Sequence, residues 1–358
     1  MDMSKNTMIA IMQDMLVALY GKETAMQVMT AKPAPRTGLP IPPRENMKLL
    51  LDHKEPMYMP MGSDCVAIMP DVVRERTPDN KSGEDWFGVH WTFGETGGAP
   101  IVKPGTEICH DVTRWREAVK IPDLDGIGWE TSAKDIEPFY HPDKMTSFWV
   151  MNGPFERLHS IIGIEDAFIA FLEEPDAVHD YMEFITEFKI KLLEKMIDHY
   201  KIDIILFHDD WGSGQNGFFS IPVFEEFIYP YMKRIVQYVK GRGVYFDLHS
   251  DGKIENYIPY VVDMGCDMWN PAQCCNDLGK IKKMYGKQLV ISGGMDDYYL
   301  DSPKITEEEL RQYVRDKIDL LAPGGGFLPK PNPKTLKSSM IMQDELMKYT
   351  KDYYGVYK

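Results

Sequence analysis

The chain has 358 residues, of which 44% are hydrophobic and 27% charged, and its formal net charge is −15. This length suits one large barrel with extensions or two domains, and the composition is typical of a globular protein. The acidic balance and the absence of a dense Lys/Arg run argue against nucleic-acid binding. No apolar run reaches the roughly 18 residues that cross a bilayer, and the N-terminus lacks the basic start of a secretory signal. We therefore expect a cytoplasmic protein that binds neither nucleic acid nor membrane.

Residues 1–45 are predicted to form an N-terminal extension. In residues 1–30, Met, Ile and Leu alternate with polar residues at helical spacing, which predicts one or two helices. The Pro-rich stretch "AKPAPRTGLPIPPRE" predicts an extended linker. A short helix is predicted over 44–53, and a short apolar strand over 56–62, "PMYMPMG".

Residues 63–145 lack a regular rhythm. They contain many Gly and Pro residues and four tryptophans, with short alternating runs such as "FGVHWTF". This pattern predicts a tryptophan-rich insertion of hairpins and loops, and not a separate domain.

From residue 147 onward, strands that are apolar on both faces alternate with amphipathic helices, one of which is predicted over 165–200. This alternation predicts a parallel sheet. With the strand at 56–62 it gives at least seven strands, which favours a (β/α)8 TIM barrel over an open sheet. No GxGxxG follows a strand near the start of the chain, which weakens the alternative of a dinucleotide-binding domain. We predict one TIM-barrel domain over 46–358, with strands in 147–154, 202–210, 244–252, 266–273, 288–296 and 325–331.

Polar residues cluster at the carboxyl ends of these strands, where TIM barrels place their active sites. The candidate catalytic residues are His249, Asp251, Asp209 and Asp210. The candidate substrate-binding residues are Asn152, Asn270, Gln273 and Asp296, with Trp149 and Trp269 as pocket walls. A strand-end Asp or Asn also serves as the N-cap of the next helix. A cap does not require histidine, however, so the His/Asp pairs favour function.

A metal site and an acid–base pair both fit these residues. His249 and Asp251 are two apart on an extended segment, so their side chains point the same way. With Asp210 they offer ligands for a divalent metal such as zinc, or groups for general acid–base catalysis. His208 precedes Asp209 and is expected to lie behind the site. The five cysteines include no CxxC pair, which argues against a structural zinc module.

The run from about 147 to 332 resembles the uroporphyrinogen decarboxylase superfamily, and within it the corrinoid-dependent methyltransferases. The resemblance lies in "NGPFERLHSIIGIEDAFIAFLEEPDAV", "HDDWGSGQNGFFSIPVFEEFIYPYMKRI", "LHSDGKIENYIPYVVDMGCDMWNPAQ" and "ISGGMD". It implies a TIM barrel with its site at the mouth. It also implies one of two activities, which are decarboxylation of a porphyrinogen and methyl transfer to or from a corrinoid on a partner protein.

Two departures from that family pattern bear on which of these activities and which metal we expect. The arginine-rich motif of the decarboxylases is replaced by "PMGSDCVAIMPDVVRERTPD", and their C-terminal histidine motif by "GGFLPKPNP". The thiol-activating methyltransferases bind zinc through His-x-Cys and a later cysteine. Here Asp251 replaces the first cysteine and "PGGGF" replaces the second. Zinc is then either lost or held by oxygen ligands.

With its tryptophan-rich insertion, the chain resembles the substrate-specific components of anaerobic O-demethylases. We predict a methyltransferase that moves a methyl group from a methoxylated, aromatic small molecule to the Co(I) of a corrinoid protein. The alternative is a decarboxylase or lyase acting on a small carboxylated compound. The tail "YTKDYYGVYK" either packs at a homodimer face or closes the barrel.

Overall fold

A computed structural model describes residues 38–77, 82–93, 100–300, 302, 304–330 and 335–354. The chain divides into the units Met1–Pro40 and Ile41–Lys358, and the second unit is described below. The helices expected in residues 1–30 and most of the Pro-rich linker lie outside the described residues.

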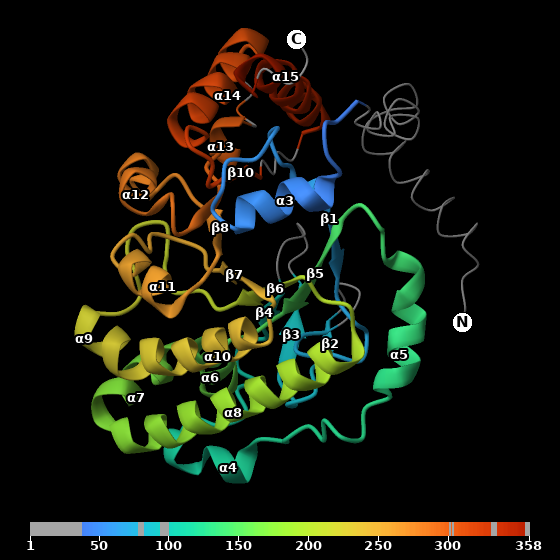
Figure 1. The fold of residues 1–358 in the computed structure, drawn as a ribbon. Helices are drawn as coiled ribbons and strands as arrows, with labels where there is room; N and C mark the ends of the chain where they lie inside the picture. The colour runs from blue at the N-terminus through green and yellow to red at the C-terminus, as the bar shows by residue number, and fades with distance from the viewer. Residues whose placement is uncertain are drawn as a thin grey trace, which may run out of the picture. The chain divides into compact units, whose positions relative to one another are not determined.

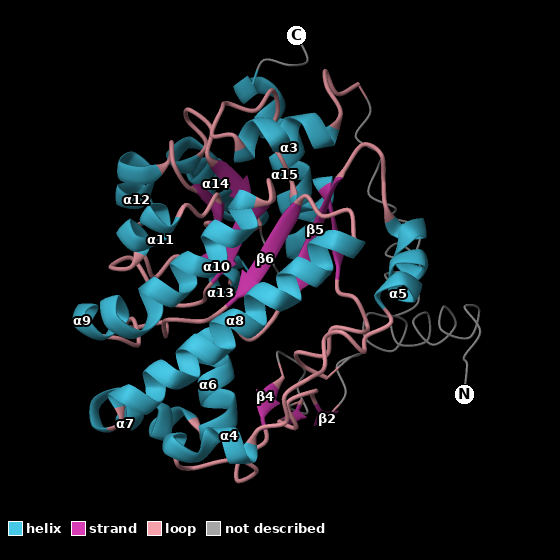
Figure 2. Cartoon of the chain, turned by 60° about the horizontal axis from the view of Figure 1, so that its bottom comes forward, coloured by secondary structure: helices cyan, strands magenta, loops and turns pink. Residues whose placement is uncertain are grey.

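Seven parallel strands form the central sheet, and each pairs with the next along the chain. The strand order is β1-β5-β6-β7-β8-β9-β10. The curled sheet is flanked by helices (Figures 1 and 2), which confirms the predicted TIM-barrel-like α/β fold. The strands are β1 (Cys65–Ile68), β5 (Met145–Val150), β6 (Ile204–His208), β7 (Tyr245–His249), β8 (Met268–Ala272), β9 (Val290–Gly293) and β10 (Phe327–Pro329).

The prediction of a strand over 56–62 is wrong, because the first strand starts later, at Cys65. Pro56 and Pro60 have no N–H to donate to a ladder. The backbone between them is held instead by the side chain of Asn46, which donates to Tyr58 O and accepts from Met57 N. The strand β1 therefore lies inside the span 63–145 that the sequence assigned to the insertion.

Helix α3 (Pro43–Leu51) closes the amino-terminal end of the barrel. Its buried residues Met47, Leu50 and Leu51 pack in one cluster with apolar side chains from the strands. Those strand residues are Met145, Ile204, Met268, Val290 and Leu328. In both views α3 lies at the end of the sheet opposite α4, α6 and α7. The amino-terminal end of the barrel therefore has an apolar floor.

The insertion between β1 and β5 carries a small antiparallel sheet of its own. This sheet joins β2 (Gly83–Glu84), β3 (His90–Thr92) and β4 (Ile101–Val102), and the helices α4 (Trp115–Ala118) and α5 (Trp129–Ile136) follow. Buried ion pairs tie it to the barrel. Arg157 contacts Glu75 at 2.7 Å and Asp85 at 2.6 Å, and Lys189 contacts Glu75 at 2.5 Å.

The remaining helices cover the outside of the sheet. The single helix expected over 165–200 is two helices, because Pro175 cannot continue α7 and instead starts α8. No helix in the described part of the chain is long and apolar enough to span a membrane. The helices are α6 (Pro154–Ile162), α7 (Ile164–Glu173), α8 (Pro175–His199), α9 (Ile221–Val223), α10 (Tyr229–Gly241), α11 (Ile258–Met264), α12 (Leu278–Tyr285), α13 (Asp297–Leu300), α14 (Glu307–Leu321) and α15 (Leu336–Tyr354).

Candidate active site

Two stacked histidines mark the mouth of the barrel. His208 and His249 are register partners at the ends of β6 and β7, and their rings stack with centroids 4.2 Å apart. His208 Nδ1 is bound to Glu156 Oε2 at 2.7 Å, and His249 Nδ1 to Asn270 Oδ1 at 2.9 Å. Both rings are thus fixed through one nitrogen, and neither Nε2 has a hydrogen-bond partner among the described residues.

Asp210 joins the two histidines in a possible metal-binding set. One ligand atom from each of His208, Asp210 and His249 lies within 4.8 Å of the others. Histidines that bind metals are commonly held through the other ring nitrogen by a carboxylate or carbonyl, as Glu156 and Asn270 hold these. The donors therefore fit a divalent ion such as zinc. The set includes His208, which was expected behind the site, in place of Asp251.

Burial and neighbouring charges set the protonation of this cluster. Burial alone would lower the pKa of His208, but the charge of Glu156 and its hydrogen bond raise it. Burial, with the charges of His208 and Lys330, lowers the pKa of His249 to about 3. Burial and the charge of Glu156 raise the pKa of Asp210 to about 7. The cluster thus contains a neutral imidazole at His249, an imidazole at His208 whose protonation is favoured by Glu156, and a carboxyl group at Asp210 that titrates near neutrality.

Glu156 and Arg76 are parts of the site that the sequence did not indicate. Arg76 Nη2 lies 3.0 Å from Glu156 Oε1, and its Nε donates to Asn152 Oδ1 at 2.8 Å. Asn152 is fully buried with φ 52°, a conformation that asparagine tolerates, and its amide donates to Glu75 O. Glu156 lies in the first turn of α6, so its position just after β5 was a usable signal. Arg76 comes from the insertion, and no local pattern connects it to the barrel.

Asp251 and Gln273 form the neighbouring rim. Gln273 donates to Asp251 Oδ1 at 2.9 Å and accepts from Gly252 N at 2.8 Å. Asp251 N in turn donates to Asp210 Oδ1 at 2.8 Å. Gly252 has φ +87°, and a Cβ there would overlap the backbone of Gly212. Asp251 therefore lies beside the cluster, joined to it through its backbone.

A polar chain leads from His249 to the last strand. Asn270 Nδ2 donates to the buried carboxylate of Asp247 at 2.7 Å, and Asn270 Oδ1 accepts from Lys330 Nζ at 3.3 Å. Burial raises the pKa of Asp247 to about 7, although the charge of Lys330 opposes this rise. Lys330 Nζ also lies 5.9 Å from the ring centroid of Trp149. These residues place a cation and a partly exposed indole at the mouth.

Three predicted site residues lie apart from this cluster. Asp209 is fully buried and accepts from Glu156 N at 2.8 Å and from Trp211 Nε1 at 2.9 Å, so it caps α6. Trp269 is fully buried and donates to Ser250 O. Asp296 accepts from Tyr299 N at 3.2 Å, in the first turn of α13. Asp209 and Trp269 neighbour His208 and Asn270, so they point to the other face of their strands.

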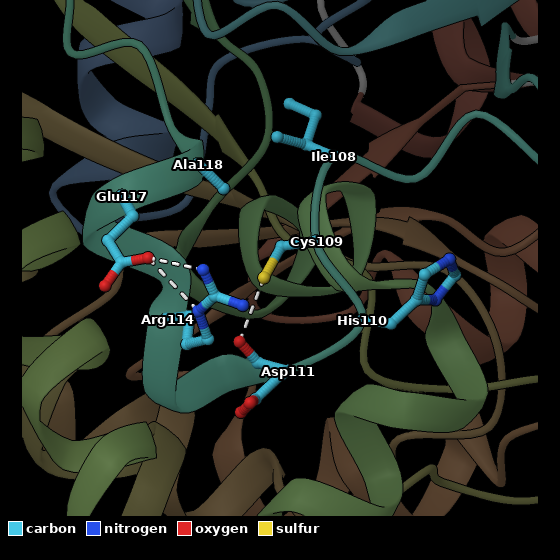
Figure 3. Close-up of a pocket in the computed structure, with 7 residues that line it drawn as sticks. All are labelled: Ile108, Cys109, His110, Asp111, Arg114, Glu117 and Ala118. Carbon is cyan, nitrogen blue, oxygen red and sulfur yellow. Dashed lines mark hydrogen bonds and ion pairs between the residues drawn. The ribbon is translucent and has the colours of Figure 1, made fainter.

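A cavity of about 500 Å³ lies elsewhere, on the segment that leads into α4 (Figure 3). Cys109 donates to Asp111 O at 2.9 Å there, and Arg114 pairs with Glu117 at 2.7 Å. None of its lining residues belongs to the predicted site, so we assign no function to it. They are Ile108, Cys109, His110, Asp111, Arg114, Glu117 and Ala118.

An α/β barrel with ionisable groups gathered at the carboxyl ends of its strands has the arrangement of TIM-barrel enzymes. Residues 85–345, more than half of the chain, match the family described as uroporphyrinogen decarboxylase (URO-D). The chain belongs to this family, as its sequence motifs indicated.

Two known proteins illustrate how far the likeness extends. A uroporphyrinogen decarboxylase of Myxococcus xanthus is 25% identical over 172 residues, which are 46% of this chain and 47% of that protein. The chain thus matches about half the length of this curated relative. A methyltransferase from Methanosarcina mazei has the same fold, with a TM-score of 0.66 at 13% identity, over 86% of this chain and 99% of that one.

Proposed function

We propose that the protein is a methyltransferase that moves a methyl group from a methoxylated aromatic compound to the Co(I) of a corrinoid held by a partner protein. The observation that carries the proposal is the set of His208, Asp210 and His249 at the barrel mouth, with both imidazoles anchored. The fold shared with the Methanosarcina mazei methyltransferase supports it.

The difficult step in this reaction is the departure of a phenolate. The methyl–oxygen bond breaks, the methyl group goes to the cobalt, and the oxygen keeps the electron pair. A divalent ion held by His208, Asp210 and His249 would supply Lewis-acid assistance to that oxygen. Without an ion, the carboxyl group of Asp210 is suited to donate a proton, because its pKa is raised to about 7.

The rest of the site would hold these groups in place and accept the ring. Glu156 and Asn270 fix the two imidazoles. Trp149 is partly exposed at the mouth and offers a flat apolar face to an aromatic donor. The cluster and the ring of the substrate would then lie side by side.

The alternative function is decarboxylation of a small carboxylated compound, and membership of the family favours it. A porphyrinogen carries several carboxylates and needs several cations. At this mouth Arg76 is already paired with Glu156, whereas Lys330 has no carboxylate partner among the side chains that the structure describes. These cations favour a substrate that carries fewer carboxylates than a porphyrinogen does.

The test is an anaerobic assay with Co(I) corrinoid, free or on a carrier protein, and a panel of methoxyaromatics. We expect the Co(I) absorption band to disappear with at least one donor. His249→Ala should abolish the change, whereas His141→Ala, at an exposed histidine, should not. No change with any donor, together with release of CO2 from a carboxylated compound, would replace this proposal by the decarboxylase.

A further inference from the structure

Lys330 occupies an unusual position in the barrel. It follows β10 and is two residues beyond Leu328, whose side chain belongs to the apolar floor. Side chains two apart on a strand share a face, so Lys330 points into the barrel, nearer its mouth. The residue is exposed, and its Nζ reaches Asn270 Oδ1 at 3.3 Å. A lysine thus stands over the polar chain that holds His249.

The charge of Lys330 is not neutralised by its described neighbours. Among the residues whose side chains the structure describes, no carboxylate is found within ion-pair distance of its Nζ. Arg76, on the other side of the mouth, differs because it contacts both Glu156 and Asn152. The charge of Lys330 lowers the pKa of Asp247, against the effect of burial, but this carboxyl group is buried and bound by Asn270.

Trp149 completes the arrangement. Its ring centroid lies 5.9 Å from Lys330 Nζ, and the side chain is partly exposed. A flat ring resting on this indole would place an anionic substituent beside the ammonium group. Asn270 Oδ1 is shared by Lys330 and His249, so the opposite edge of the ring would face the cluster.

We propose that Lys330 binds a carboxylate on the aromatic donor, so that the substrates are methoxylated aromatic acids. This inference rests on the proposed function for the methoxy group, but the carboxylate subsite stands on Lys330, Asn270 and Trp149. Lysine binds such a group as a point charge on a flexible stem. Its role is to position the ring, and the developing phenolate lies at the cluster, on the other side of Asn270.

The test compares binding of 4-methoxybenzoate and 4-methoxybenzamide by calorimetry, without corrinoid, so that no turnover occurs. The two probes differ in charge and hardly in shape. We expect the wild type to bind the acid about ten-fold or more tightly than the amide, because a hydrogen bond between charged groups increases affinity by about that factor. Lys330→Met should remove this preference, and Lys330→Arg should keep part of it. Lys287→Met, at an exposed lysine, is the control.

Each outcome separates the two proposals. Equal affinity for the two probes, no binding of either probe, or an unchanged preference in Lys330→Met would overturn the carboxylate subsite, whether or not methyl transfer is found. A preference for the acid that depends on Lys330, in a protein that transfers no methyl group, would keep the subsite and remove the proposed reaction. In the transfer assay, Lys330→Met should raise the KM for the acid more than it raises the KM for the amide.

Discussion

At the scale of single residues, the anchored imidazoles allow a direct test of metal binding. After dialysis against zinc, the wild type should retain the ion, and His249→Ala and Asp210→Asn should not, because each removes a donor atom. Glu156→Gln should weaken the affinity by about 10- to 100-fold, the usual effect of losing a group that orients a ligand. Metal content is measured by mass spectrometry.

Asp251→Asn is the matched control for that series. The sequence placed Asp251 among the ligands, whereas in the structure its carboxylate is bound by Gln273, and His208 completes the set. Asp251→Asn should therefore retain the metal. If it loses the ion as completely as Asp210→Asn does, the ligand set drawn from the structure is wrong.

His159 provides a prediction for the pH dependence of stability. Burial lowers its pKa to about 4, more than the charge of Glu156 raises it. Between its unfolded value of 6.5 and pH 4, the unfolded chain binds a proton that the folded chain does not, so stability is lost as the pH falls. The wild type should lose about 1–2 kcal/mol more than His159→Gln between pH 7 and 5.

Urea unfolding at both pH values measures this difference. His141→Gln, at an exposed histidine, should follow the wild type. Equal losses in His159→Gln and the wild type would show that His159 gains its proton in the folded state.

The sequence predicted part of this site and missed the rest for a physical reason. Strand-end position identified His249, Asp210 and Asn270, because all strand ends of a barrel meet at one mouth. Because side chains alternate along a strand, Asp209 is expected on the opposite face from His208 and Asp210. Which of these two faces points to the mouth can be known only from the fold. Arg76 contacts residues that are far from it in the sequence, so the local sequence pattern does not indicate its place in the site.

At the scale of elements, the insertion depends on a buried ionic network. Arg157 on α6 binds Glu75 and Asp85, and all three side chains are almost fully buried. Arg157→Met would leave two buried carboxylates without their shared cation. Removing one partner of such a pair typically costs about 3–5 kcal/mol, because the remaining charge stays desolvated. Chemical unfolding should show this loss.

The control for this variant is Arg114→Met, which breaks an exposed pair with Glu117 and should change the stability little. Arg157→Met should also raise the KM for the donor, because Glu75 is adjacent to Arg76, which contacts Glu156. A stable Arg157→Met protein with unchanged KM would show that the network has neither role.

Element boundaries were predictable where the period of the hydrophobic pattern changes, as it does along the run of β5 to β10. The break at Pro175 between α7 and α8 was missed, because the helical spacing of apolar residues continues on both sides of it. The position of β1 was also missed, because the methionines of "PMYMPMG" resemble an apolar strand, and β1 itself has only four residues. Hydrogen bonding by Asn46 decides that case, and it depends on α3 lying under the segment.

At the scale of the whole barrel, we expect the residues of the floor to determine stability and the residues of the mouth to determine function. The floor is an apolar cluster in which Leu50 of α3 is fully buried, and the mouth holds the polar chain from Glu156 to Lys330. Leu50→Ala leaves a cavity in the floor and should lower the free energy of unfolding by about 2–5 kcal/mol. At a temperature where the variant remains folded, its kcat/KM should stay within about two-fold of the wild type, since TIM barrels keep catalysis at the other end.

His249→Ala should behave in the opposite way. The ring is held by one hydrogen bond to Asn270 and by stacking on His208, so its loss should change the unfolding midpoint little while transfer is abolished. Leu172→Ala, at an exposed leucine on α7, should change neither property. Thermal unfolding and the transfer assay on the three variants measure both quantities. If Leu50→Ala reduces kcat/KM as strongly as it reduces stability, the floor is coupled to the mouth, and the two ends of the barrel are not independent.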